Sequence, residues 1–182
     1  MEERGYSKRK HTRLDAWDYS SPWWYFVTIC TTDMRRLFGK IVNETMVLNN
    51  EGSVVDEEWK STEIVRTNVK LDMFQVMPNH MHMVFEIVDM PFRRGVPRTP
   101  TLIETGASIA PLHRQPQSVG SIIGGFKSSV TKRIRILNND PTLKIWQRGY
   151  YDRIIRNGAE LDRVRTYILN NPQTWEDDEY YH

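Results

Sequence analysis

Two histidines separated by a single residue, His80 and His82, stand in the apolar segment HMHMVFEIV (80–88). Successive side chains of a β-strand point to opposite faces, so both imidazoles are expected on one face, close enough to share a metal ion. The intervening residues are expected to face the core: Met81, Met83, Phe85 and Ile87. Two imidazoles leave coordination positions open, as a catalytic metal requires. Because the motif is short, the alternative is a pair of partly exposed strand histidines that bind nothing.

A tyrosine and an asparagine, Tyr167 and Asn171, lie one helical turn apart within residues 157–171. Residues four apart are neighbours on a helix surface, and these two adjoin an apolar stripe. The stripe consists of Leu161, Val164 and Ile168. A tyrosine beside such a stripe is typical of core packing, and an asparagine before a proline is typical of a helix end. Only the histidine pair makes these two residues candidates for a functional site.

Positive charge is concentrated between residues 118 and 156, where eight Lys and Arg side chains face only Asp140 and Asp152. The whole chain has a net charge of +2, so this excess is local. Three aromatic residues lie among the basic ones: Trp146, Tyr150 and Tyr151. Basic groups beside rings that can stack on bases favour single-stranded nucleic acid. The alternative is a solvated helix face with its aromatic residues in the core.

The composition excludes several classes of protein. The 182 residues include 25 Lys and Arg against 23 Asp and Glu, too balanced for a histone-like binder or an acidic disordered protein. The only cysteine is Cys30, which excludes a disulfide scaffold and a cysteine-rich zinc site. No apolar run approaches the ~20 residues of a membrane span, and the polar N-terminus does not resemble a secretory signal. We therefore expect a protein of the reducing cytoplasm.

Seven elements are needed to position these residues, in the order β-α-β-β-α-β-α. The expected strands are 23–31, 71–77, 80–88 and 150–156, and the expected helices are 49–64, 118–137 and 157–171. The two-residue break at Pro78 and Asn79 predicts a hairpin between the second and third strands. The first six elements match an α+β, ferredoxin-like split β-α-β fold, with a four-stranded antiparallel sheet and two helices on one face. The other face is left for the last helix, a ligand or both.

One domain is expected, because domains hold roughly 150 residues. We assign residues 1–20 to a basic N-terminal arm and residues 21–175 to the domain. Within it, residues 89–118 contain five of the nine prolines and read as a long loop, either a mobile insertion or a functional one. Residues 176–182 are expected to form an exposed acidic tail.

Three segments together carry a resemblance to a known family. They are MPNHMH (77–82), WQRGYYDRIIR (146–156) and YILNNP (167–172). In this order and spacing they resemble the REP-associated tyrosine transposases, a branch of the single-tyrosine HUH transposases. The resemblance runs from about Trp24 to Pro172, and it implies a fold of the HUH endonuclease type with a C-terminal catalytic helix.

The resemblance also implies an activity and a set of functional residues. The family's activity is that of a metal-dependent single-stranded DNA endonuclease and strand transferase, which acts through a 5′-phosphotyrosine intermediate at hairpin or repeat DNA. By position, His80 and His82 would bind Mg²⁺ or Mn²⁺, Tyr167 would be the nucleophile, and Asn171 would be a third metal ligand. An amide is a weaker ligand than the family's usual residues at that position. The expected partner is single-stranded or hairpin DNA rather than a membrane, and a nucleoid-associated monomer is expected, with a dimer as the alternative.

The local excess of positive charge supplies the candidate DNA contacts. They are Lys127, Lys132, Arg133, Arg148 and Arg153.

Two other functions stay open from the residues alone. A catalytically silent nucleic-acid-binding domain would keep the basic helix and lose nothing when Tyr167 is replaced by Phe. A metal-dependent phosphodiesterase would use His80 and His82 with an activated water, and it would leave no covalent DNA adduct.

Overall fold

A four-stranded antiparallel sheet organises the computed structural model, which describes residues 17–89 and 117–181. Its strands, in the order β4-β5-β1-β6, are β1 (Trp23–Cys30), β4 (Val69–Val76), β5 (His80–Ile87) and β6 (Tyr151–Ile154). All neighbours pair antiparallel. The strand order is that of the ferredoxin-like fold, so the expected α+β class and the β4–β5 hairpin are confirmed. Most of the expected N-terminal arm and Pro-rich loop lies outside the described residues.

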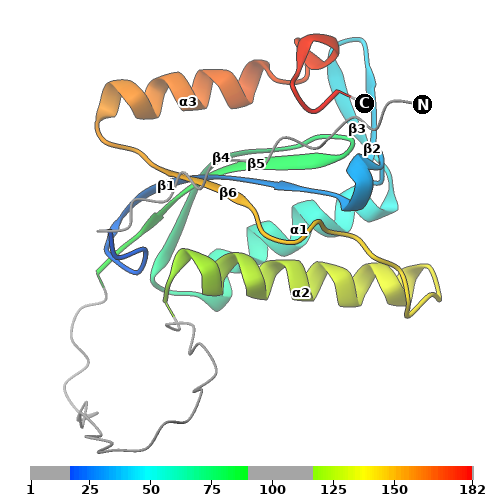
Figure 1. Ribbon diagram of the computed structural model, residues 1–182, viewed down its shortest axis with the longest axis horizontal. Coiled ribbons are helices and arrows are strands. Elements are labelled where there is room, and N and C mark those ends of the chain that lie inside the picture. The colour runs from blue at the N-terminus through cyan, green and yellow to red at the C-terminus, as the bar shows by residue number, and fades with distance from the viewer. Residues whose placement is uncertain (1–16, 90–116, 182) are drawn as a thin grey trace, which may run out of the picture.

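Helices cover both faces of this sheet. Figure 1 shows α1 (Asn50–Val65) and α2 (Val119–Leu137) on one face and α3 (Gly158–Asn170) on the other. None of the helices within residues 17–89 and 117–181 is long and apolar enough to cross a bilayer. The last helix of the chain therefore occupies the face that the split β-α-β unit leaves open.

A two-stranded ribbon, β2 (Gly39–Val42) and β3 (Thr45–Leu48), has no counterpart among the expected strands. Each strand has only four residues. The turn residues Asn43 and Glu44 both have positive φ, as a two-residue hairpin turn requires. Since an Asn-Glu pair lacks the glycine that usually marks such a turn, the sequence signal was weak. Two short 3₁₀ turns complete the described elements: η1 (Thr32–Met34) and η2 (Trp175–Asp177).

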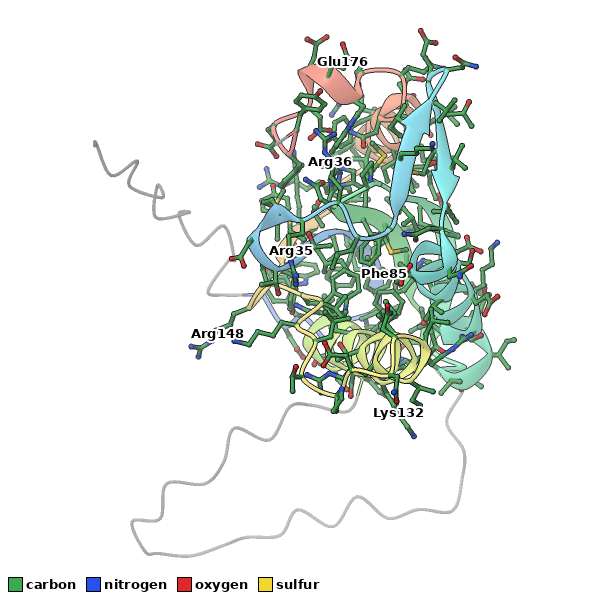
Figure 2. The ribbon with its side chains drawn as sticks, turned by 90° about the vertical axis from the view of Figure 1, so that its right-hand side faces the viewer. Arg35, Arg36, Phe85, Lys132, Arg148 and Glu176 are labelled. Atoms are coloured by element: carbon green, nitrogen blue, oxygen red, sulfur yellow. The ribbon has the colours of Figure 1, made fainter. Side chains whose placement is uncertain are left out.

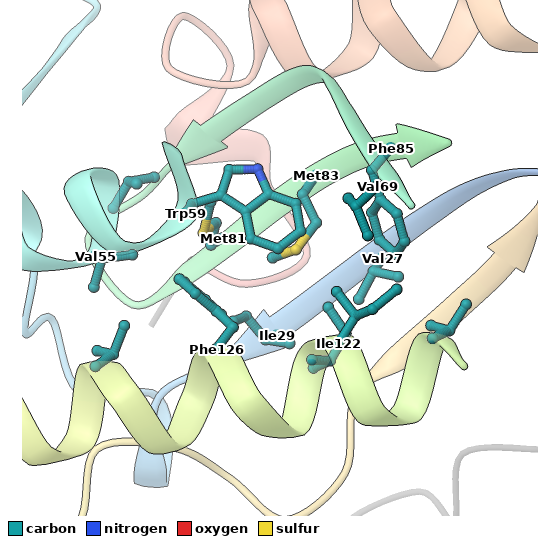
Figure 3. Packing of buried hydrophobic residues seen from close by; sticks show 14 of the residues in the cluster. Val27, Ile29, Val55, Trp59, Val69, Met81, Met83, Phe85, Ile122 and Phe126 are labelled. Carbon is teal, nitrogen blue, oxygen red and sulfur yellow. The ribbon is translucent and has the colours of Figure 1, made fainter. Parts of the chain in front are cut away.

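The main core lies between the sheet and the helices α1 and α2. Its centre is Trp59, which is fully buried and contacts the rings of Phe85 and Phe126 edge-on. Figure 3 shows this tryptophan between α1, α2 and the inner face of the sheet. Met81 and Met83 join the same core, so the expected alternation along β5 is confirmed. The opposite face of β5 is therefore left to the two histidines.

A smaller apolar cluster holds α3 against the opposite face of the sheet. Val164 and Ile168 of the helix pack there with Phe26 and Val84 of the sheet. The helix begins after Asn157, whose side chain accepts a hydrogen bond from the Glu160 backbone N–H, as the sequence predicts. These contacts fix where each turn of α3 lies above the strands.

An ion pair adds a second attachment of α3 to the sheet. The Arg165 guanidinium donates through Nε and Nη2 to the two carboxylate oxygens of Asp72 on β4, at 2.9 and 2.5 Å. The guanidinium also lies over the Trp24 ring, 5.9 Å from its centroid. A planar fork that binds both oxygens fixes direction as well as distance. The ion pair thus attaches α3 to β4 at Arg165, two residues before Tyr167.

Among the described residues of the expected acidic tail, Glu176, Asp177 and Glu179 are exposed, but the segment is attached to the domain. The segment 175–181 lies on the same side of the sheet as α3 (Figure 1). Tyr180 is 6% exposed, and Asp178 is only partly exposed. Two buried aromatic side chains anchor it, those of Trp175 and Tyr180.

The ion pair predicts a pH dependence of stability. The hydrogen bonds from Arg165 lower the pKa of Asp72 below its ordinary value, so the pair stabilises the fold at pH values above about 4 and is lost as the pH falls through the folded-state pKa. We expect Asp72→Asn to lower the free energy of unfolding by about 1 kcal/mol at pH 7, because the pair is partly exposed. Urea denaturation from pH 7 to pH 2 measures the difference, which should shrink below pH 4.

Asp162→Asn is the matched control, since Asp162 also contacts Arg165 but is 75% exposed. It should change stability by less than about 0.5 kcal/mol. If the difference in free energy of unfolding between Asp72→Asn and the unmodified protein stays constant down to pH 2, the ion pair with Arg165 does not stabilise the fold as described.

Candidate metal and nucleophile site

The histidine pair of β5 lies under the C-terminal part of α3 and the segment that follows it. His80 and His82 are 0% and 1% exposed, and their Nε2 atoms lie 3.0 Å apart. The shared face that the sequence predicts is therefore present, although the side chains are buried rather than partly exposed. Because α3 and residues 175–181 cover this face, the histidines are not the partly exposed surface pair of the alternative interpretation.

Each imidazole is oriented by a hydrogen bond on its other nitrogen. His80 Nδ1 lies 2.9 Å from Asn79 Oδ1, and His82 Nδ1 lies 2.8 Å from Thr28 Oγ1. Partners of this kind set the ring orientation and the tautomer of metal-binding histidines. Neither partner was among the predicted site residues. Asn79 lies inside the segment MPNHMH and could have been considered, whereas Thr28 is one of several polar positions in an apolar strand.

Both imidazoles are neutral in this environment. Burial lowers the pKa of His82 to about 3. Burial and the neighbouring His82 lower the pKa of His80 well below its usual value, and the nearby Asn171 side chain offsets part of that decrease. A neutral imidazole is the form that binds a metal ion. The pair is therefore ready to bind a cation without losing protons first.

The phenol of Tyr167 closes the same site from α3. Its Oη lies 3.1 Å from His82 Nε2, and the side chain is 42% exposed. The ring meets Phe26 edge-on at a centroid distance of 6.3 Å, which sets its direction. Burial raises the pKa of the Tyr167 phenol above its usual value, and the carboxylates of Asp178 and Glu179 raise it further. The tyrosine is thus accessible from outside but stays protonated at neutral pH.

A carboxylate completes a possible ligand set. His80, His82 and Asp178 each offer one ligand atom, and these atoms lie within 4.8 Å of one another. Asp178 Oδ1 accepts a hydrogen bond from the Tyr180 backbone N–H at 2.7 Å, which fixes the carboxylate. Burial raises the pKa of Asp178. The sequence did not single out this residue, because it belongs to the acidic run that resembles a tail.

The predicted third ligand, Asn171, lies beside the histidines, but its side chain contacts Asp178. It is fully buried, and its Nδ2 donates a hydrogen bond to Asp178 Oδ2. Its buried Oδ1 has no well-aligned hydrogen bond among the described residues, although the side chain lies close enough to His80 to raise the pKa of that imidazole. A buried carbonyl oxygen without a partner is costly unless something else, such as a cation, satisfies it.

These donors fit a divalent cation. Nitrogen ligands held about 2.1 Å from one octahedral ion, at a right angle, lie about 3.0 Å apart, which is the separation of the two Nε2 atoms. One carboxylate and one unpaired amide oxygen stand beside them. Carboxylate and amide oxygens suit Mg²⁺ or Mn²⁺, whereas imidazole nitrogens also suit Zn²⁺ and other transition metals.

A pocket of about 770 Å³ leads to this site. Its walls come from β1, β6, α3 and the C-terminal segment, and they include His82 and Tyr167. Two arginines also line it: Arg153 of β6 and Arg163 of α3. Arg153 is paired with Glu160 at 2.5 Å, but its side chain is 55% exposed. Of the predicted DNA contacts, Arg153 is thus the one that lies at the site, and Arg163 joins it without having been predicted.

The other predicted DNA contacts lie elsewhere. Lys127, Lys132 and Arg133 belong to α2, on the opposite face of the sheet, and Figure 2 shows Lys132 and Arg148 far from Glu176 of the C-terminal segment. Arg133 is neutralised by Glu57 and Glu58 of α1. A linear count of charges could not show which cations pair within the fold.

Two of these basic residues belong to a second hollow in the surface. Lys127 and Lys132, together with Arg135 and Lys144, line a groove of about 1060 Å³ between α2 and the segment after it. None of its lining residues in the described part of the chain carries a carboxylate. Lys127 also donates to the carbonyls of Gln147 and Gly149, at 2.7 and 2.9 Å, and so holds that segment to α2.

Known proteins resemble this chain in sequence and in fold. No family model matches the chain. An uncharacterized protein of Haemophilus influenzae is 36% identical over 177 residues, which span 97% of this chain and 95% of that protein. Among solved structures, a REP-associated tyrosine transposase bound to a REP hairpin matches with a TM-score of 0.57 and 14% identity, over 90% of this chain and 74% of that one. At this identity, the match establishes a shared fold.

The donor set predicts how metal binding responds to substitution. We expect His80→Ala and His82→Ala each to weaken Mn²⁺ binding at least about tenfold in calorimetric titration, because each removes one of few ligands. Val84→Ala is the control, since Val84 follows on the same face of β5 and is fully buried. It should lower stability by about 1–3 kcal/mol and leave Mn²⁺ affinity unchanged.

The packing alternative has the opposite signature. If the histidines only fill space, their alanine variants would lose stability like a core deletion, roughly 2–5 kcal/mol, with no change in Mn²⁺ affinity.

Proposed function

The chain belongs to one family with the Haemophilus influenzae protein, and we propose that it is a metal-dependent single-stranded DNA endonuclease and strand transferase. The observation that carries the proposal is the 3.1 Å separation between Tyr167 Oη and His82 Nε2. A phenol on a helix thus meets a pair of neutral imidazoles at the end of a pocket whose lining holds two arginines and the carboxylates of Glu160, Asp177, Asp178 and Glu179. The fold shared with a tyrosine transposase bound to a DNA hairpin supports the same activity.

In the proposed reaction, Tyr167 Oη attacks the phosphorus of a backbone phosphodiester. A new bond forms between the phenol oxygen and phosphorus, and the bond from phosphorus to the 3′-oxygen breaks. The phenol loses its proton and the departing 3′-oxygen gains one, which leaves a 5′-phosphotyrosine and a free 3′-hydroxyl. Because the covalent intermediate keeps a phosphodiester bond, the 3′-hydroxyl of another strand can reverse the step and be joined without ATP.

The chain's own charges explain why a cation is needed. Burial and the carboxylates of Asp178 and Glu179 keep the Tyr167 phenol protonated, and a protonated phenol is a poor nucleophile. A bound Mg²⁺ or Mn²⁺ supplies positive charge that favours the phenolate and stabilises the charge that develops on the phosphate oxygens. His80 and His82 would hold it, with Asp178 or Asn171 Oδ1 as a third ligand.

Helix α3 holds the proposed nucleophile, Tyr167, in a fixed position. Val164 and Ile168 fix the rotation of α3 against the sheet, and Arg165 fixes its direction through Asp72. Holding a reactant in line with its target can supply several kcal/mol of the barrier reduction.

Contacts to DNA are proposed in two places. Arg153 and Arg163 line the pocket beside Tyr167, where they would bind the backbone on either side of the scissile phosphate. Lys127, Lys132 and Arg148, on or near α2, would bind DNA outside the cleavage site. Arg133 is the weakest of the proposed contacts, because two glutamates already bind it.

Covalent adduct formation tests the proposal. The protein is incubated with short single-stranded hairpin DNA and Mn²⁺, and a denaturing gel measures protein-linked DNA. We expect Tyr167→Phe to lose the adduct by more than about 1,000-fold, while DNA binding and folding persist, because only the nucleophilic oxygen is removed. Tyr151→Phe is the matched control, since Tyr151 lines the same pocket and should keep the adduct.

Each rival function has its own result in this experiment. Cleavage that persists in Tyr167→Phe and leaves no adduct in either protein would indicate a phosphodiesterase that uses activated water. DNA binding with neither cleavage nor adduct would indicate a silent binding domain. An adduct on the peptide that contains Tyr150 and Tyr151 would overturn the choice of nucleophile.

A further inference from the structure

We infer that Asn79 is a positioning residue that fixes His80 in one tautomer and links this tautomer to the seating of the C-terminal segment. In that tautomer, Nδ1 carries the proton and Nε2 keeps a free lone pair that faces the site. The inference rests on the proposed function only for the use of that lone pair. The hydrogen bonds that carry it belong to the protein itself.

The orientation of the Asn79 amide follows from its surroundings. The side chain is fully buried, and its Nδ2 donates to two backbone carbonyls: Met34 O at 3.2 Å and Tyr180 O at 2.7 Å. Carbonyl oxygens only accept hydrogen bonds, so the NH₂ group has to face them. Exchanging the amide oxygen and nitrogen would set an oxygen against both carbonyls. Asn79 Oδ1 therefore points to the other side, toward His80.

This orientation determines the tautomer of His80. Its Nδ1 lies 2.9 Å from Asn79 Oδ1, which can only accept, so Nδ1 has to be the donor. A neutral imidazole carries a single N–H. His80 Nε2 is therefore without a proton and presents its lone pair toward His82 Nε2, 3.0 Å away.

The second histidine has no such constraint. Its Nδ1 faces the Thr28 hydroxyl, which both donates and accepts hydrogen bonds. In the metal-free protein, His82 Nε2–H has two acceptors within reach, the bare His80 Nε2 at 3.0 Å and Tyr167 Oη at 3.1 Å, and Thr28 donates to His82 Nδ1. When a cation binds, His82 can move its proton to Nδ1 and donate to Thr28. One histidine is thus fixed and the other adapts.

The backbone of Asn79 is held separately from its side chain. The Asn79 carbonyl accepts hydrogen bonds from Thr31 N–H at 2.8 Å and from Thr31 Oγ1 at 2.9 Å. Replacing the side chain therefore leaves the turn between β4 and β5 anchored. The expected consequence of a substitution is a change at His80 and Tyr180, not a rearranged strand.

The Tyr180 carbonyl is one of the two anchors of the amide, so the C-terminal segment takes part in the orientation. The Tyr180 ring also packs against His80, with centroids 4.6 Å apart. If this segment moves away, Asn79 loses its shorter hydrogen bond, and the constraint on His80 weakens. The packing of residues 175–181 and the tautomer of His80 are thus coupled through the Asn79 side chain.

Nitrogen-15 NMR of the histidine rings in the metal-free protein tests this inference. In the unmodified protein we expect His80 to be a single Nδ1–H tautomer. In Asn79→Ala we expect a mixture of tautomers and Mn²⁺ affinity about 10–100-fold weaker. Asn68→Ala is the matched control, because Asn68 is also a buried asparagine next to the same hairpin, and it should change neither measurement.

A second variant tests the link to the C-terminal segment. Asn79→Asp keeps the size of the side chain but sets a carboxylate oxygen against the Met34 and Tyr180 carbonyls. We expect faster amide hydrogen exchange in residues 175–181 for this variant. Unchanged exchange would refute the link.

An unmodified protein whose His80 carries its proton on Nε2 would overturn the inference, even if the variants fail to fold. The NMR result does not depend on DNA cleavage. A protein with the Nδ1–H tautomer but no covalent adduct would refute the proposed function and leave this inference standing.

Discussion

The alternation of side chains along β5 is the constraint on which the rest of the structure depends. One set of residues, which includes Met81 and Met83, completes the core beneath the sheet, so the other set, which includes His80 and His82, has to leave the opposite face. A shift by one residue would exchange the two sets and bury the imidazoles among aliphatic side chains. The main core thus fixes the position of the site from the opposite face of the sheet.

Burial is the second requirement of this arrangement. Helix α3 and residues 175–181 remove the histidines from water, so both stay neutral and each keeps one ring nitrogen without a proton. The same burial, with Asp178 and Glu179 nearby, keeps Tyr167 protonated. In the proposed reaction, a cation entering this site of neutral bases, a carboxylate and an unreactive phenol would activate the phenol. The proposed metal dependence would therefore follow from the desolvation of the site.

Sequence patterns predicted what depends on short-range periodicity. The alternation at His80 and His82 and the one-turn spacing of Tyr167 and Asn171 are local, and both match the structure. Asp178 could not be found in this way, because its role depends on the chain folding back over β5, and an acidic run normally remains in solvent. The pairing of Arg133 with Glu57 and Glu58 is likewise tertiary: it depends on how α1 and α2 pack. The ribbon β2–β3 was missed because its turn lacks a glycine.

The central claim is that His80, His82 and Tyr167 converge on one divalent cation. Anomalous diffraction from crystals of the protein grown with Mn²⁺ tests it most directly. We predict a single strong peak in contact with both Nε2 atoms, beside Tyr167 Oη, and the same map shows whether Asp178 or Asn171 supplies a further ligand. A histidine pair that stays hydrogen-bonded to itself, with Mn²⁺ bound elsewhere or not at all, would contradict the claim.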